Sequence, residues 1–80
     1  MEKLSGKMTA ILVYTRDSGD RTHSGRGGWS VASMRALERR GLVRLVARHT
    51  WNENWELTDA GRETADANIR DKIEKGLRTR

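Results

Sequence analysis

The sequence predicts an α+β fold that is mostly α, built as one domain over residues 1–80. Three observations lead to this prediction. A basic segment with helical spacing ends at Gly41, an alternating segment follows it, and the capping residues Thr58 and Asp59 open a third segment. A chain of 80 residues without cysteine forms a single domain with a small core. The predicted order is helix, loop, helix, β-hairpin and final helix.

The first helix is predicted over residues 2–14. Apolar residues recur there at the spacing of one buried helix face, at Leu4, Met8, Ile11 and Leu12. Residues 16–29 are predicted to be a flexible loop, because they are rich in glycine and poor in apolar side chains. A plain connector is favoured over a calcium or phosphate loop, since neither the Asp-x-Asp-x-Asp-Gly spacing nor a Gly-Lys-Ser/Thr motif is present.

The second helix is predicted over residues 30–40. Ser30 offers a hydroxyl for the N-cap, and Gly41 stands where a left-handed residue ends a helix. Val31, Met34 and Leu37 share one face, which indicates a buried side.

A two-stranded hairpin is predicted next. Residues 43–51 alternate, so that two sets of side chains lie on opposite faces: Val43, Leu45, Ala47 and His49 on one, and Arg44, Val46, Arg48 and Thr50 on the other. Residues 52–54 are interpreted as the turn, because asparagine tolerates positive φ. The return strand then begins at Trp55, and Trp55 and Leu57 supply its apolar face.

The last helix is predicted from Thr58 or Asp59 to about residue 77, with residues 76–80 as a frayed tail. Its apolar residues are spaced by four: Ala65, Ile69, Ile73 and Leu77. A stripe this narrow suits packing on one partner, either the first helix of the same chain or the same helix of a second chain. The acidic residues of this helix are interpreted as surface residues that pair at i, i+4 with basic residues of the same helix.

Positive charge is concentrated in residues 26–48. This segment carries six arginines against Glu38, which equals the formal net charge of +5 of the whole chain. Arginine contacts phosphate and guanine in a bidentate way, so the segment is typical of a nucleic-acid surface. A solvated basic face is the alternative interpretation.

Several function classes are disfavoured. The absence of cysteine excludes thiolate metal sites and thiol catalysis, and His23 and His49 lie far apart, so neither a metal nor a cofactor is expected. No Ser–His–acid set in a cleft is indicated, and we expect no enzyme. No run reaches the length of a membrane span or a signal-peptide core, so a soluble, cytoplasmic protein is expected.

Two motifs resemble a known family. The segments Ala-Leu-Glu-Arg-Arg-Gly-Leu-Val (36–43) and Trp-Glu-Leu-Thr-Asp-Ala-Gly-Arg (55–62) look like the recognition-helix end and the post-wing segment of MarR-like bacterial winged-helix regulators. The resemblance covers about residues 30–65. It implies a winged helix that regulates transcription, with the helix 30–40 in the major groove of double-stranded DNA and the wing 48–54 on the backbone or minor groove. The chain departs from the family in lacking a convincing second helix and in having few long side chains on the reading helix.

Carried over by position, the resemblance and the charge pattern give a set of candidate DNA-binding residues. Arg35 is expected to reach guanine or a phosphate, and the following arginines are expected to clamp phosphates. The N-terminus of the helix at Ser30 offers backbone N–H groups to a phosphate. The complete set is Arg26, Ser30, Ser33, Arg35, Arg39, Arg40, Arg44, Arg48, His49 and Asn52.

A protein-interaction module is the alternative function, for example a phage or plasmid protein that docks on a host factor. Its interface would use Trp51 and, for a homodimer, Ile69, Ile73 and Leu77. Trp51 has two interpretations, an exposed anchor at the wing tip or a cross-strand partner of Trp55. Trp29 is interpreted as a staple on the following helix rather than as a DNA contact. RNA binding is less favoured, because no stacked aromatic platform is visible.

Overall fold

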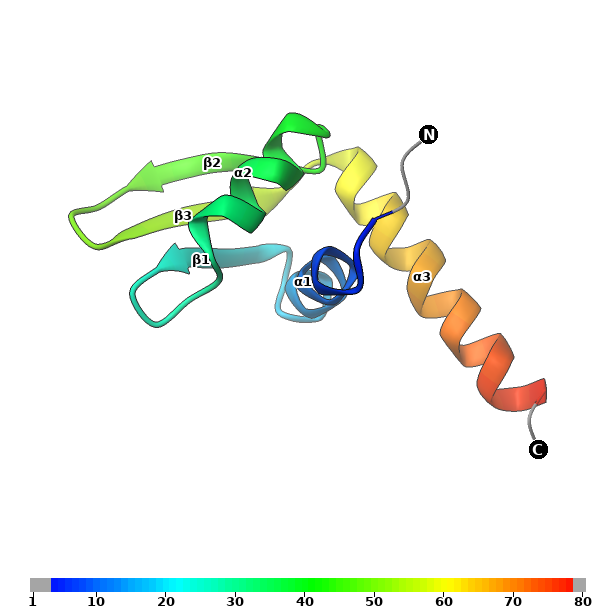
Figure 1. Ribbon diagram of the computed structural model, residues 1–80. Helices are drawn as coiled ribbons and strands as arrows, with labels where there is room; N and C mark the ends of the chain where they lie inside the picture. Colours follow the sequence, from blue (N-terminus) through cyan, green and yellow to red (C-terminus); the bar gives the residue numbers. More distant parts are fainter. Residues whose placement is uncertain (1–3, 79–80) are drawn as a thin grey trace.

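The computed structural model describes residues 4–78, and their side chains over 4–71. Within this range it is a small α+β domain in which three helices accompany a three-stranded antiparallel sheet (Figure 1). The predicted class is therefore confirmed at this level. The elements run, in chain order, α1 (Gly6–Asp17), β1 (Arg21–Gly25), α2 (Val31–Arg39), β2 (Val43–Arg48), β3 (Asn52–Leu57) and α3 (Asp59–Arg78).

The sheet has the order β1-β3-β2, so the last strand in the chain is the central one. The predicted flexible loop over 16–29 is therefore wrong, because it contains β1, and its first residues belong to α1. The predicted hairpin is confirmed as the antiparallel pair of β2 and β3, but it is not isolated, because β3 also pairs with β1. β1 has the sequence Arg-Thr-His-Ser-Gly, without one large apolar residue, and an apolar pattern could not reveal it.

α1 begins four residues and ends three residues later than predicted, and residues 2–3 of the predicted helix lie outside the described residues. The Ser5 Oγ accepts a hydrogen bond from the Met8 N–H at 3.1 Å and so caps the helix at its N-terminus. At the other end the helix continues past Tyr14 to Asp17. Thr15 in this last turn is fully buried, and its hydroxyl donates to the Ile11 carbonyl at 2.6 Å. Asp20, at φ 69°, turns the chain into β1.

α2 begins and ends where the capping residues predict. Ser30 is the N-cap, and its Oγ accepts from the Ser33 N–H at 3.5 Å. Gly41 has φ 75°, its N–H donates to the Glu38 carbonyl, and the Leu42 N–H donates to the Leu37 carbonyl. This pair of bonds is the Schellman ending that glycine allows. Between β1 and α2 the described chain makes a tight turn and no additional helix.

The hairpin differs from the prediction in both its turn and its register. The connection is 49–51, while residues 52–54, interpreted as the turn, begin the central strand. A β-bulge between Leu45 and Ala47 shifts the register by one residue. Because side chains alternate along a strand, the bulge moves Arg48 to the opposite face from Arg44. The prediction that Arg44, Val46 and Arg48 share one face is wrong.

α3 begins as predicted, with the Thr58 Oγ1 accepting from the Gly61 N–H at 3.1 Å. It extends to Arg78, so the part of the predicted tail that the structure describes, 76–78, is helical. Its first half packs on α1, and its second half projects away from the body (Figure 1). None of the helices over the described residues is long and apolar enough to cross a membrane.

The core lies between the inner face of the sheet and the three helices. It contains side chains from every described helix and from β2 and β3: Ile11, Leu12, Met34, Leu37, Leu42, Val43, Trp55, Leu57 and Ala65. Trp29 is partly buried against this core, and its indole N–H donates to Thr22 Oγ1 at 3.0 Å, as a packed rather than a DNA-facing residue would. Trp55 and Leu57 are core residues, as predicted.

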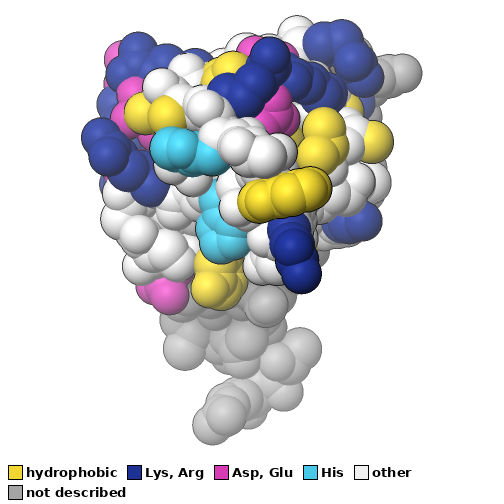
Figure 2. Space-filling view, turned by 90° about the vertical axis from the view of Figure 1, so that its left-hand side faces the viewer, with side chains coloured by type: hydrophobic (Ala, Val, Ile, Leu, Met, Phe, Trp, Pro, Cys, Tyr) yellow, Lys and Arg dark blue, Asp and Glu magenta, His cyan; other side chains and the backbone are white. Residues whose placement is uncertain are grey.

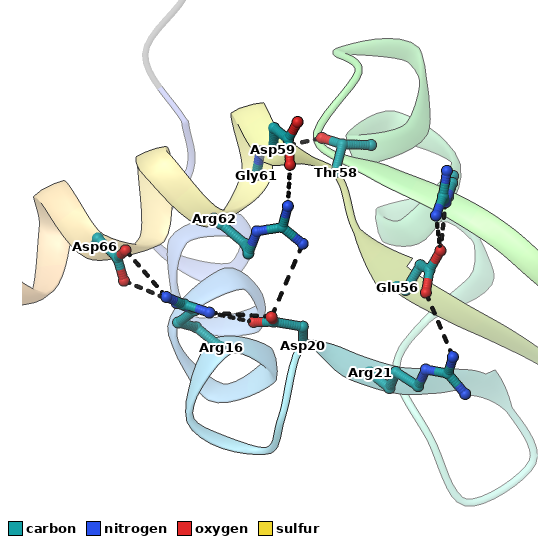
Figure 3. A network of polar contacts seen from close by, with 10 residues as sticks. Arg16, Asp20, Arg21, Glu56, Thr58, Asp59, Gly61, Arg62 and Asp66 are labelled. Carbon is teal, nitrogen blue, oxygen red and sulfur yellow. Dashed lines mark hydrogen bonds and ion pairs between the residues drawn. The ribbon is translucent and has the colours of Figure 1, made fainter.

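An ion-pair network joins the end of α1 to α3 (Figure 3). Arg16 contacts Asp66 at 2.9 Å and Asp20 at 2.9 Å, and Asp20 also faces Arg62. The hydrogen bond from Arg16 lowers the pKa of Asp66 below its ordinary value of 3.8. Asp66 therefore pairs across to α1, which differs from the predicted pairing along its own helix.

Gly61 tests the close approach of α3 to the loop before β2. A Cβ on Gly61 would collide with the Leu42 carbonyl oxygen, which is backbone and cannot rotate away. We expect Gly61→Ala to lower the free energy of unfolding by about 1–3 kcal/mol. Gly6→Ala is the matched control, because Gly6 is also in a first helical turn but has nothing within 4 Å. Urea denaturation measures both variants, and equal stability of the two would contradict the packing described.

Asp66 tests the network through the pH dependence of stability. Folding lowers its pKa, so the carboxylate adds stability that is complete above the ordinary pKa of 3.8 and is lost as pH falls through the lowered value. We expect Asp66→Asn to be less stable than the wild type at neutral pH. The difference should shrink as pH falls from about 5 to about 2. Thermal melts across this range measure it, with Glu63→Gln on the same helix as control. A difference that does not change with pH would argue against the pairing.

Candidate nucleic-acid interface

The elements predicted to contact DNA lie at one end of the molecule. α2 packs on the sheet in contact with β2 and β1. The connection 49–51, here called the hairpin tip, extends away from the projecting half of α3 (Figure 1). Figure 2 shows this end, where basic, hydrophobic and histidine side chains lie close together on the surface. The predicted residues divide into structural and exposed groups.

Arg35 is held in place by three neighbours. Its guanidinium contacts Glu38 at 3.3 Å and Glu53 at 2.8 Å, and its Cζ lies 5.4 Å from the ring centroid of Trp55. The side chain is 34% exposed. Arg35 is therefore a link between α2 and β3 in this structure, and a base or phosphate would have to compete with Glu53 for it.

Arg48 joins the same cluster because of the bulge. Its Nε donates to Glu53 Oε2 at 2.8 Å, the oxygen that Arg35 also contacts. Arg48 is 62% exposed, whereas the Glu53 side chain is 12% exposed. Glu53 thus accepts hydrogen bonds from both α2 and the hairpin. Counting charges over residues 26–48 missed Glu53, because it lies beyond that segment. Its place two residues before Trp55, which puts both side chains on one face of a strand, is the sequence signal that could have identified it.

Arg44 lies apart from the candidate interface. It pairs with Glu56. Glu56 also faces Arg21 at 3.7 Å (Figure 3), so the three side chains form a row across the sheet. Because Glu56 alternates with the inward residues Trp55 and Leu57, this row is on the outer face of the sheet. Arg44 is exposed, but the structure does not place it beside α2.

The basic surface is therefore weaker than the charge count predicts. Three of the six arginines share carboxylates, with Glu38 and Glu53 on one face and Glu56 on the other. Arg26 and Arg39 are exposed and make no ion pair within the described residues. Arg39 and Arg40 line a shallow hollow with Met8 and Ala36, between α1 and the end of α2. Arg26 and Arg39, which are available to a polyanion, thus lie near the two ends of α2.

The remaining predicted residues are mostly structural. Ser30 caps α2, and Ser33 is half-buried in its first turn. The Asn52 Nδ2 donates to the Arg26 carbonyl at 2.7 Å, which ties the hairpin to the turn before α2. The His49 ring lies 3.1 Å from the Asn54 amide, and both side chains are near the tip.

The residues predicted for a protein interface have different positions. Trp51 is 68% exposed at the hairpin tip. Trp55 instead faces Leu45 and Thr22 in register, so the interpretation of Trp51 as its cross-strand partner is wrong. Ile69 is half-buried on α3, and the side chains of Ile73 and Leu77 lie outside the described residues.

Polar and basic side chains line the hollows at this end of the molecule. Within the described residues, no three His, Cys, Asp or Glu side chains come close enough to hold a metal ion. The hollows at this end are open, and the polar side chains that line them are four arginines together with Ser24, His49, Thr50, Asn52 and Glu53. Such groups suit contacts to phosphates and to base edges.

Arg35 and Arg39 test the division between structural and exposed arginines. Arg35→Ala removes two ion pairs and the contact with Trp55, and leaves the largely buried Glu53 with Arg48. We expect it to lower the free energy of unfolding by about 1–2 kcal/mol. Arg39→Ala removes an exposed side chain of the same charge from the same helix and should change stability by less than about 0.5 kcal/mol. Chemical denaturation compares them, and equal losses would contradict the structural role of Arg35.

The chain was compared with protein-family models, with curated proteins and with solved structures. No family model matches it, and neither a curated protein nor a solved structure does.

Proposed function

We propose that this domain is a winged helix that binds double-stranded DNA, as a transcriptional regulator, with α2 in the major groove and the hairpin against the adjacent backbone. The observation that carries the proposal is the placement of α2. It stands directly before a hairpin in a β1-β3-β2 sheet, with the exposed arginines Arg26 and Arg39 flanking it. A winged helix presents its recognition helix in this position, and a positively charged pair at its ends suits two phosphate strands of one groove.

The outer face of α2 supports close approach to DNA. Ala32 is exposed and Ala36 is half-exposed, so the helix backbone can come near a groove without displacing long side chains. Ser30 caps the helix with its side chain, and Val31 and Ala32 behind it are exposed, which leaves the positive end of the helix open to a phosphate. These contacts supply affinity and orientation more than sequence preference.

A protein-interaction domain is the second candidate. The observation that favours it is the neutralisation of Arg35 and Arg48 by Glu53, which leaves few charges for a polyanion on the face where α2 meets the hairpin. The exposed Trp51 would then be the anchor of a protein interface, because aromatic residues dominate such contacts.

A salt titration tests the proposal. We expect the wild type to bind random duplex DNA with an affinity that falls steeply as salt rises, because each phosphate contact releases counterions. Arg39→Ala should weaken binding and reduce the slope of log affinity against log salt by about 0.9, the value for one lost contact. Fluorescence anisotropy of a labelled duplex measures both quantities.

Arg70→Ala is the matched control for that experiment. Arg70 is exposed on α3, away from α2, and its loss changes the net charge by the same amount. It should leave the slope unchanged. Absence of binding by the wild type at low salt would contradict the DNA proposal and favour the protein-interaction domain, and an equal effect of the two variants would contradict the assigned face.

A further inference from the structure

Trp51 is the most exposed large hydrophobic residue of the described chain, at 68%. It lies in the hairpin tip, whereas Trp29 and Trp55 pack in or against the core. A single exposed apolar residue needs no explanation by itself. Trp51 becomes informative because of how its backbone is held and what lies beside it.

The backbone of Trp51 is fixed by the turn before α2. Its carbonyl accepts a hydrogen bond from the Arg26 N–H at 3.1 Å, and Asn52 returns a bond to the Arg26 carbonyl at 2.7 Å. Gly25 packs so closely against the backbone of Trp51 that a Cβ on Gly25 would collide with the Trp51 carbonyl oxygen. The His49 N–H closes the tip on the Asn52 carbonyl at 2.7 Å. The indole is therefore presented from a braced position, beside Arg26.

An open hollow of about 270 Å³ adjoins Trp51, between the hairpin and the start of α2. Its walls combine two apolar side chains, Trp51 and the 43% exposed Val31, with the Arg35, Arg48 and Glu53 cluster. Glu53 Oε1 is buried and has no hydrogen-bond partner within the described residues. A volume below that of ordinary drug-sized sites suits one flat group with polar edges.

The charge around the hollow selects the kind of ligand. Glu38 and Glu53 offset Arg35 and Arg48, and Arg26 beside the hollow makes no ion pair within the described residues. The small positive charge that remains favours a single anionic group, such as one phosphate, over a basic peptide. An aromatic face with neighbouring arginines is the arrangement by which proteins hold an unstacked base together with its phosphate. A donor group on a base edge would also supply the partner that a buried carboxylate oxygen requires.

We propose that Trp51 stacks on an unpaired base, and that the hollow between Trp51 and Val31 receives this nucleotide while α2 holds the flanking duplex. The inference rests on the proposed DNA binding and adds to it a preference for duplexes with an unpaired nucleotide. Arg48, which is 62% exposed, and Arg26 contact the phosphates on either side. Binding of the paired duplex by α2 does not require an unpaired base. It can therefore be measured separately from the stacking of an unpaired base on Trp51.

Three duplexes of the same sequence test the inference: fully paired, with one extra unpaired nucleotide, and with an abasic site in place of that nucleotide. We expect the wild type to bind the duplex with the unpaired base about tenfold more tightly than the other two, the gain of one base–aromatic stack. The abasic duplex separates stacking from the greater flexibility of a bulged duplex. Anisotropy titrations at one fixed salt concentration measure all three.

Trp51→Ala should remove the tenfold preference and leave binding to the paired duplex unchanged, while Trp51→Phe should keep most of the preference. Val46→Ala is the matched control, because Val46 is exposed on the same hairpin but does not line the hollow. Since Trp51 and Val46 are both exposed, these variants should fold as the wild type does, which circular dichroism verifies.

Equal affinity of the wild type for the paired and bulged duplexes would overturn the inference and leave the proposed DNA binding intact. A preference that survives in Trp51→Ala, or that the abasic duplex also shows, would overturn it too. Trp51 would then be assigned to a protein partner. Failure of the wild type to bind any of the three duplexes at low salt would overturn the proposed function itself.

Discussion

The fold depends on Trp55, the buried aromatic residue of the central strand. Its neighbours in register are Leu45 on β2 and Thr22 on β1, so one side chain lies between both outer strands. Its indole N–H donates to Ser24 Oγ at 2.8 Å, and the Arg35 guanidinium lies over its ring. A buried indole N–H requires an acceptor, and Ser24, itself fully buried, provides it from a strand that has no large apolar residue. The polar strand β1 is therefore held in the fold by its backbone pairing with β3 and by the acceptor that Ser24 gives to the Trp55 indole.

The helices could be predicted from the sequence better than the sheet could. Capping residues mark the start of α2 at Ser30 and of α3 at Thr58, and Gly41 marks the end of α2, because these positions have local chemical requirements. β1 and the start of β3 at Asn52 could not be predicted, since polar residues such as His23 and Asn54 join a strand only through a partner distant in sequence. The bulge at Val46 could not be predicted for the same reason, because the pairing of β2 with the central strand determines its position.

The candidate site shows the same limit in its electrostatics. Counting charge along the chain identified a basic segment, and the arginines within it are largely on the surface. Their partners Glu53 and Glu56 come from the following strand, and the fold brings them beside Arg35, Arg48 and Arg44. An arginine that is paired with a carboxylate attracts phosphate less strongly, because the carboxylate offsets part of its charge. The local sequence therefore locates the basic face but overstates its net positive charge. In the proposed binding of DNA, Arg26 and Arg39 near the ends of α2 count for more than the paired arginines of the hairpin.

The position of β3 at the centre of the sheet has a consequence for the order in which the domain forms. β2 and β3 are joined by a short connection, so their pairing closes a small loop and can form early. β1 must wait for β3, because Arg21 lies opposite Glu56 across nearly half of the chain, and no large apolar residue of its own holds it in place meanwhile. We therefore expect an intermediate stage in protein synthesis at which α1 and α2 have emerged but the sheet is still open. The ribosome must release Trp55 and the residues that follow it before β1 has a strand with which to pair.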